Sequence, residues 1–187
     1  MDTVRYEELT SPHSFDYKEA MFYCQLLFNL SRADTHRVLK HLLIPKKLAP
    51  NRFFFVVAKK GDQLVGFSLF YYLQRVNLGY LDYIAVLPEY RGEGIGVGLY
   101  QKTVSMLEEH QEDVYGMLFE VHQAEGLEMR KDFFRKQGAV KLDLSKYKKV
   151  VQDTNLEMMF HSFNVQSLEV NEIVADNIKG ALSNVLL

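Results

Sequence analysis

Apolar and polar residues follow two different periods along the chain, and together they predict a mixed α/β domain. Helical spacing of apolar residues covers Phe15 to Leu30 and, over a shorter stretch, Thr35 to Leu43. Strand-like patterns cover Val4 to Leu9, Arg52 to Lys59 and Gln63 to Gln74. A tight-turn pair, Gly61 and Asp62, joins the two longer strands, so they predict a hairpin.

The second half of the chain alternates strands with helices. Asn77 and Gly79 mark a turn before a strand from Tyr80 to Val86, which completes a three-strand meander. The further predicted strands are Val114 to His122, Ala139 to Leu144 and Asn155 to Phe163. The further predicted helices are Ile95 to His110, Leu127 to Gln137 with a stop at Gly138, and Leu168 to Leu186.

The last of these helices has an apolar stripe formed by Ile173, Val174, Ile178, Leu182 and Val185. Such a stripe must be covered, either by the protein's own sheet or by a second subunit. Packing on the sheet of the same chain is the first expectation. The oligomeric state is therefore expected to be a monomer or a homodimer.

The composition fits one globular domain over residues 1–187, because no repeat, linker or low-complexity segment interrupts it. Of the 187 residues, 48% are hydrophobic and 25% are charged, which is enough for a sizeable core. The 22 Lys and Arg nearly balance the 24 Asp and Glu without any basic run, so no nucleic-acid partner is expected. The longest apolar runs, such as Phe53 to Ala58, are strand-sized, so no membrane association is expected. Cys24 is the single cysteine and the N-terminus has no signal-peptide pattern, so we expect a cytoplasmic protein.

The stretch from Tyr80 to Tyr100 gives the strongest functional signal. It is a predicted buried strand, followed by a loop with Pro88, a glycine cluster and the start of an amphipathic helix. Glycines let the backbone approach an anion closely, and the amides that open a helix point at it along the helix dipole. The pattern predicts a phosphate site; the alternative is a plain strand–turn–helix whose glycines serve packing.

Two well-known phosphate-binding motifs are excluded by counting. A P-loop ends in a Gly-Lys pair, and the chain has none. A dinucleotide-binding turn needs a glycine at its sixth position. Counted from each of the three glycines that could open the motif, that position holds Val97, Leu99 or Gln101.

What fits is Arg91-x-x-Gly94-x-Gly96, directly after a strand that ends in Ile84-Ala85-Val86. This pattern resembles the signature of the GNAT superfamily of acyl-CoA-dependent N-acetyltransferases. A second match, from Phe133 to Ala139, resembles the end of the family's fourth helix and follows a strand at Phe119-Glu120-Val121. The resemblance covers about residues 52–163. The early helices fit the family's variable acceptor-binding region, and a helix in 166–187 lies beyond the usual core.

The resemblance implies a mixed, mostly antiparallel sheet of six to seven strands, flanked by helices and splayed between the fourth and fifth strands. In such a fold the backbone of the fourth strand, here Ile84, Ala85 and Val86, pairs with the pantetheine arm of CoA. Arg91 would add charge at the pyrophosphate, and Phe134 would lie at the cofactor. The amides that would cradle the pyrophosphate belong to Gly92, Glu93, Gly94, Ile95, Gly96 and Val97. Acetyl-CoA is the implied co-substrate, and no metal is expected, because no residue grouping has metal-ligand spacing.

The chain departs from the family pattern where a general acid is expected. Many relatives have a tyrosine that protonates the leaving thiolate at the position of Phe134, which has no proton to give. Another hydroxyl could substitute, and Tyr83 and Tyr147 are the candidates, although both could be packing residues. The thiolate could also leave into water at a cost in rate.

A general base is also needed, because an alkylamine has a pKa of roughly 10 and attacks the thioester only when uncharged. Some family members place a glutamate early on the fourth strand, where this chain has Tyr80. Asp82 lies two residues on and is the first candidate for the base; the alternative is a structural ion pair or hydrogen bond. Glu120 on the neighbouring strand is the second. His122 lies on the same side as Glu120, and its alternative is a solvent-facing histidine at a strand end.

Together these residues predict an enzyme that moves an acetyl group from acetyl-CoA to a primary amine by direct attack in a ternary complex. A backbone amide near Val86 is the expected donor to the oxyanion. The acceptor could be a partly apolar small-molecule amine, a protein N-terminus or a lysine side chain, and a longer acyl group or a hydroxyl acceptor stays open. The alternative from another class is a non-catalytic acyl-CoA-binding sensor or scaffold module, which Phe134 favours.

Overall fold

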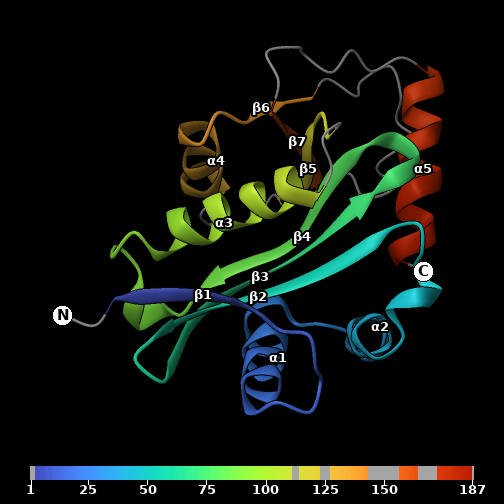
Figure 1. Ribbon diagram of the computed structural model, residues 1–187. Coiled ribbons are helices and arrows are strands. Elements are labelled where there is room, and N and C mark those ends of the chain that lie inside the picture. The colour runs from blue at the N-terminus through green and yellow to red at the C-terminus, as the bar shows by residue number, and fades with distance from the viewer. Residues whose placement is uncertain (1–2, 111–113, 123–126, 143–155, 164–171, 187) are drawn as a thin grey trace.

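The computed structural model describes residues 3–110, 114–122, 127–142, 156–163 and 172–186, which form one sheet with helices on both of its faces (Figure 1). The strands are β1 (Val4–Glu8), β2 (Arg52–Lys60), β3 (Gln63–Leu73), β4 (Leu78–Val86), β5 (Gly116–His122), β6 (Val140–Lys141) and β7 (Leu156–Ser162). The helices are α1 (Phe15–Phe28), α2 (Arg32–Leu43), α3 (Ile95–His110), α4 (Leu127–Lys136) and α5 (Glu172–Leu186). Short 3-10 turns lie at Pro45–Lys47, Gln74–Val76 and Pro88–Tyr90.

The strands lie in the order β1-β2-β3-β4-β5-β7-β6. Within the described part of the chain, β4 and β5 run parallel and every other neighbouring pair is antiparallel. A parallel pair needs a crossover connection, which α3 supplies between β4 and β5. The predicted mixed, mostly antiparallel sheet is therefore confirmed.

The turns of the meander agree with the sequence at two positions and differ at a third. Lys60 pairs with Gln63 across the β2–β3 hairpin, and Gly61 has a φ of 61° that suits the turn. Asn77 also has a positive φ, 50°, directly before β4. Gly79 was predicted to mark the turn. It lies instead inside β4, where a Cβ would meet the Leu107 side chain of α3. Close helix–strand packing, not chain reversal, is therefore what this glycine serves.

The pairing of β3 with β4 is interrupted by a β-bulge. Leu69 lies opposite Tyr83 and Phe70 opposite Leu81, so Asp82 is the extra residue in β4. The pairing of β4 with β5 ends at Leu81, which lies opposite Phe119. Because a bulge bends its strand and increases its twist, the bulge explains why β4 leaves β5 here. The splay predicted between the fourth and fifth strands is confirmed.

The helices divide between the two faces of the sheet (Figure 1). Helices α3 and α4 pack on one face, where Leu99 and Phe134 join a core cluster with Phe119. Helices α1 and α2 cover the β2–β3 part of the opposite face, and α5 covers the β4–β5–β7 part of that face. The buried apolar side chains of α5 are Ala175, Ile178, Ala181, Leu182 and Val185, and they pack on this chain's own sheet. The first expectation for the C-terminal stripe is thus confirmed, apart from Ile173, whose side chain lies outside the described residues.

Several element boundaries differ from the prediction by a few residues, and for α2 the reason is local. Helix α2 begins at Arg32, not at Thr35, because Ser31 and Asp34 form a capping box. Strand β6 covers only Val140–Lys141 of the predicted 139–144, and residues 143 and 144 lie outside the described part. In that described part, no helix has the length and apolarity that crossing a membrane requires.

Candidate functional site

A cavity of about 480 Å³ lies where β4 and β5 part. Its walls come from the C-terminal end of α1, the bulged part of β4, the end of β5 and α4. Most of the lining is apolar, and Phe28 and Phe134 contribute to it from the two opposite faces of the sheet. The polar lining includes Tyr80, Asp82, Tyr83 and Glu120. We call this space the cleft.

The bulge decides which side chains of β4 share a side of the sheet. Tyr80 packs with the α5 cluster, whereas Ile84 packs with the α3 cluster on the opposite face. Between them, the extra residue lets both Asp82 and Tyr83 face the side of α1 and α2, where Asp82 pairs with Arg37 and Tyr83 packs with Phe28. A regular strand would have placed these two neighbours on opposite faces.

Asp82 forms a buried ion pair. Its Oδ2 accepts a hydrogen bond from Arg37 Nη1 at 2.9 Å, and the two side chains are 7% and 8% exposed. Burial raises the pKa of Asp82 to about 6, although the Arg37 guanidinium acts to lower it. Oδ1 accepts no hydrogen bond from the residues that the structure describes. The ion pair that was the alternative to a base is therefore present, and it occupies only one of the two carboxylate oxygens of Asp82.

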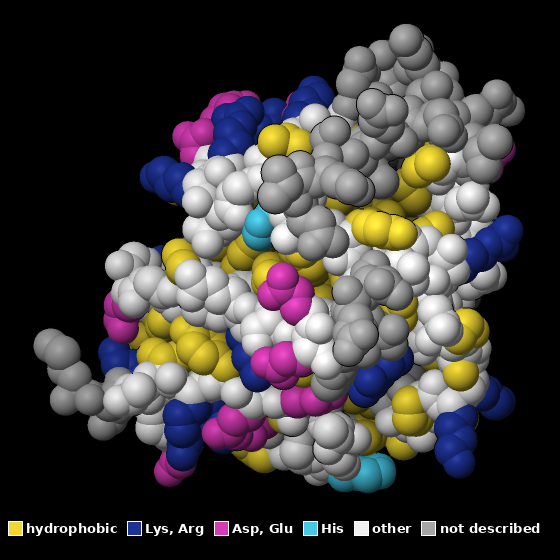
Figure 2. Space-filling view, turned by 45° about the horizontal axis from the view of Figure 1, so that its top comes forward, with side chains coloured by type: hydrophobic (Ala, Val, Ile, Leu, Met, Phe, Trp, Pro, Cys, Tyr) yellow, Lys and Arg dark blue, Asp and Glu magenta, His cyan; other side chains and the backbone are white. Residues whose placement is uncertain are grey.

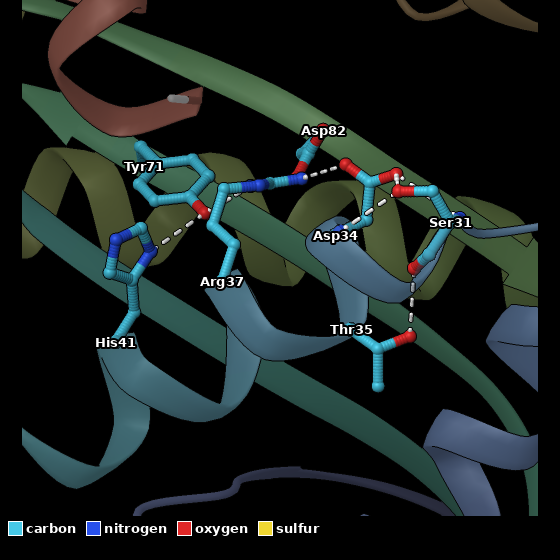
Figure 3. Close-up of polar contacts among 7 residues, drawn as sticks. All are labelled: Ser31, Asp34, Thr35, Arg37, His41, Tyr71 and Asp82. Atoms are coloured by element: carbon cyan, nitrogen blue, oxygen red, sulfur yellow. Dashed lines mark hydrogen bonds and ion pairs between the residues drawn. The ribbon is translucent and has the colours of Figure 1, made fainter.

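Arg37 belongs to a longer chain of polar contacts that continues to Tyr71 and His41, neither of which lines the cleft (Figure 3). The Tyr71 hydroxyl accepts a hydrogen bond from Arg37 Nη1 at 2.5 Å and lies 3.1 Å from His41 Nδ1. Because a guanidinium can only donate, the hydroxyl hydrogen is free to go to His41 Nδ1, which must then be unprotonated. Burial and the nearby Arg37 lower the pKa of His41 to about 4, which agrees with a neutral imidazole.

The glycine cluster forms an exposed loop between β4 and α3. Gly92 and Gly94 have φ values of 87° and 81°, and a Cβ on either would meet nothing within 4 Å. Arg91 Nε donates to the carbonyl of Val86 at 3.2 Å, which ties the loop to the end of β4. No acceptor in the described part of the chain receives the amides of residues 92–97. The loop thus presents open backbone donors at a helix N-terminus.

The same loop carries a carboxylate. Glu93 lies between the two left-handed glycines, and its Oε2 is 2.7 Å from Lys60 Nζ at the end of β2. The ion pair neutralises a charge that would otherwise repel an anion at the loop amides. Lys60 thereby brings the β2–β3 hairpin next to the loop.

Phe134 lines the cleft from α4, and its ring centroid lies 4.3 Å from that of Phe119 on β5. The position is thus an apolar wall without a proton to donate. Of the two candidate replacements, Tyr83 lines the cleft and Tyr147 lies outside the described residues. The His122 side chain also lies outside them.

The structure brings most of the predicted site residues to one place. Asp82, Ile84, Glu120 and Phe134 line one cleft, and the loop follows from the far end of the same strand, through Ala85 and Val86. Sequence reasoning missed three charged or polar residues that the fold adds, namely Arg37, His41 and Lys60. No local pattern marks them as partners, because each meets its partner only through the tertiary fold.

The face of the molecule seen in Figure 2 has no single dominant charge. In the space-filling view, Lys and Arg side chains are scattered among Asp and Glu, with hydrophobic side chains exposed between them (Figure 2). Among the described residues, no group of three or more His, Cys, Asp or Glu is placed to hold a metal ion. The cleft is therefore best described as an apolar space with a few polar groups in its lining.

Comparisons with known proteins agree with this arrangement. The model of the acetyltransferase (GNAT) family matches residues 6–139. The match includes α1 and α2 and ends before β7, so it begins and ends earlier than the 52–163 that the motifs indicated. None of the curated proteins compared with the chain matches it.

Several solved structures have a similar fold. Ard1 from Thermoplasma volcanium is 20% identical, with a TM-score of 0.62 over 85% of this chain and 97% of that one. PaiA N-acetyltransferase from Thermoplasma acidophilum, in complex with coenzyme A, is 15% identical, with a TM-score of 0.60 over 86% and 99%. The ribosomal-protein-S18-alanine N-acetyltransferase from Escherichia coli is 14% identical, with a TM-score of 0.59 over 90% and 99%.

Proposed function

The chain belongs to the GNAT family of acetyltransferases, and we propose that it moves an acetyl group from acetyl-CoA to a primary amine by direct attack in a ternary complex. The observation that carries the proposal is the order of three features along the chain: Asp82 in the cleft, the edge of β4 that pairs with no β5 residue beyond Leu81, and the loop with open amides. A phosphate-bearing donor fits the loop and an amine acceptor fits the cleft.

The loop fits the diphosphate of CoA on geometric grounds. Its amides have no protein acceptor in the described part, and open space stands where a Cβ of Gly92 or Gly94 would lie. The edge of β4 beyond Leu81 has lost its β5 partner, so Ile84, Ala85 and Val86 can offer backbone groups to the pantetheine arm. The related PaiA structure contains coenzyme A, which supports the same ligand here.

Asp82 is the proposed general base. Its pKa of about 6 leaves it ionised at neutral pH, yet close enough to that pH to accept a proton efficiently. It would take the proton of the acceptor amine on Oδ1, while Oδ2 stays on Arg37. Glu120, across the splay on β5, is the second candidate.

Two further groups complete the proposed mechanism. The free amides of β4 near Val86 are the donors to the developing oxyanion. Tyr83 takes the place of the missing tyrosine of α4 as hydrogen-bond donor to the leaving thiolate, because Tyr83 belongs to the cleft lining. Burial raises the pKa of Tyr83, so it would act as a hydrogen-bond donor that remains protonated.

The proposal is tested in two steps, binding and turnover. Acetyl-CoA at about 100 times its Kd should stabilise the fold by roughly 2.7 kcal/mol, which is about 5–10 °C in Tm for a chain of this size. Release of CoA from acetyl-CoA is then measured in the presence of each candidate acceptor. The acceptors are alkylamines, aralkylamines, peptides and amino acids. Absence of both the Tm shift and the turnover would reject the proposal.

The second candidate is a non-catalytic acyl-CoA-binding module. The apolar Phe134 wall favours it, because the usual proton donor is replaced by a ring that packs on Phe119. This candidate predicts the same Tm shift with acetyl-CoA but no CoA release with any amine. The turnover panel therefore separates the two functions.

The acceptor class is the least constrained part of the proposal. Ribosomal-protein-S18-alanine N-acetyltransferase is named for a protein acceptor, which supports including peptide N-termini in the panel. The lining is mostly apolar and includes two carboxylates and the cation Arg130, which favours an amine that is attached to an apolar group.

A further inference from the structure

Arg37 reaches from α2 to the bulge of β4 and is fixed on three sides (Figure 3). Its guanidinium donates to Asp82 at 2.9 Å and to the Tyr71 hydroxyl at 2.5 Å, and Nη2 lies 3.5 Å from Asp34 Oδ1. Moving the cation away would leave the Asp82 charge buried without a partner, which is costly. The geometry therefore holds the two groups together.

Asp34 links this cation to the start of α2. Its Oδ2 accepts hydrogen bonds from the Ser31 amide at 3.2 Å and the Ser31 hydroxyl at 2.6 Å, while Oδ1 faces Arg37. The capping box makes the first turn of α2 rigid. Arg37 is thus held by a well-capped helix, which fixes a side chain more firmly than a loop does.

We propose that Arg37 is a positioning residue for acyl transfer: it holds Oδ2 of Asp82 so that Oδ1 is presented to the cleft. The inference rests on the proposed function and deepens it. Asp82 is the extra residue of a bulge, so the strand register alone does not fix its direction. Without the guanidinium, the carboxyl could turn about its side-chain bonds and Oδ1 would lose its orientation.

Arg37 also controls the charge balance at Asp82. The cation lowers the pKa of Asp82, whereas burial and the nearby Asp34 raise it. Other titratable groups on the elements packed around the carboxyl include Cys24, His41, Tyr71, Tyr80, Tyr83, Glu120 and Arg130. Removal of Arg37 and removal of Asp34 should therefore have opposite effects on the titration of Asp82.

The experiment compares the pH dependence of kcat/KM for acetyl transfer in the full chain and in three variants. The rising limb of this pH profile reports the ionisation of Asp82. In Arg37→Gln the midpoint of the limb should move up from about pH 6 by about 1–3 pH units, which lowers kcat/KM at pH 7 by about 2- to 100-fold. Arg37→Lys keeps a positive charge but cannot hold both Asp82 and Tyr71, so the midpoint of its limb should lie between those of the wild type and Arg37→Gln. Asp34→Asn should move the limb down.

A matched control removes a different part-buried ion pair. Lys59 pairs with Asp16 at 2.9 Å between β2 and α1, so Lys59→Gln should lower Tm without moving the limb. If Arg37→Gln does not fold, Arg37→Lys and a carbon NMR titration of the Asp82 carboxyl, assigned with Asp82→Asn, decide the question. An unchanged limb and an unchanged carboxyl titration in the Arg37 variants overturn the inference.

The failure of the proposed function would look different. A wild type that neither binds acetyl-CoA nor releases CoA rejects the function, and the NMR titration then still tests whether Arg37 controls Asp82. A wild type that turns over amines without a limb near pH 6 overturns the role of Arg37 while acyl transfer stands.

Discussion

At the scale of single residues, the proposed chemistry depends on a competition at Asp82. A cation at hydrogen-bonding distance lowers the pKa of a carboxyl, and burial raises it. Burial is the larger influence here, since the pKa of Asp82 is raised to about 6 in spite of Arg37. An exposed aspartate, with a pKa of about 3.9, would be a far weaker base. The ion pair and the proposed catalytic role are therefore compatible, because each uses a different oxygen.

This competition gives a testable pH dependence. A base must be ionised to act, so kcat/KM should rise with pH through about 6 and level off above it. Asp82→Asn should remove this limb and lower kcat/KM at pH 7 by about 10²- to 10⁴-fold. The check is a pH series at subsaturating amine, with Glu120→Gln measured beside it. Full activity in both variants would contradict both base assignments without excluding an enzyme.

At the scale of elements, the loop before α3 divides its glycines into two kinds. Gly92 and Gly94 need their left-handed backbone, whereas Gly96 lacks a positive φ and a Cβ there would lie 3.5 Å from Val86 and 3.6 Å from Phe133. The fold itself thus tolerates a small side chain at Gly96. The proposed close approach of CoA, which the sequence motif indicates, would account for that glycine.

The left-handed geometry predicts the effect of Gly94→Ala. A Cβ at this φ costs about 1–2 kcal/mol and pulls the loop amides out of line. Acetyl-CoA binding, measured by calorimetry, should weaken at least tenfold while the fold persists. Gly138→Ala is the control for left-handed strain, because Gly138 has a φ of 94° just after α4 and is not part of the loop; a Cβ there would also lie 3.3 Å from His161. Equal losses of binding in both variants would show that strain alone, and not the loop, is responsible.

The Glu93–Lys60 pair gives a second prediction for this loop. Glu93→Gln removes a negative charge beside the proposed diphosphate site, so CoA should bind about two- to tenfold more tightly. Lys60→Gln leaves Glu93 unopposed and should weaken binding. The double variant tests whether Lys60 only neutralises Glu93. If so, the double variant should bind CoA as tightly as Glu93→Gln does. Calorimetry at two salt concentrations checks all three, and a Glu93→Gln variant that binds CoA more weakly would contradict the prediction.

These elements also show what the sequence could predict. Repeated local patterns identified the strands and helices, and a short motif with a strand before it identified the loop. The bulge at Asp82 leaves no such pattern, since it depends on how β3 pairs with β4. The pairing of Arg37 with Asp82 spans 45 positions in the chain and depends on the docking of α2, so no spacing rule could reveal it. Candidate bases were therefore predictable, but their surroundings were not.

At the scale of the whole molecule, the two faces of the sheet have separate tasks. Helix α3 on one face presents the loop, and α1 and α2 on the other face contribute Phe28 to the cleft and Arg37 to its carboxylate. The splay between β4 and β5 is the place where both faces open into one space. Helix α5 lies on the α1–α2 face but beside β7, and its buried side chains contact the sheet away from the loop.

This arrangement predicts that α5 supports the fold without supporting cofactor binding. Ile178 is 1% exposed and packs against the sheet of the same chain, so Ile178→Ala should cost about 2–5 kcal/mol and lower Tm by about 5–15 °C. The Kd for acetyl-CoA should stay within about twofold, because the loop lies on the opposite face. Ser183→Ala, at an exposed position of the same helix, should change neither quantity, and a large loss of acetyl-CoA affinity in Ile178→Ala would mean that the two faces are coupled through the splay.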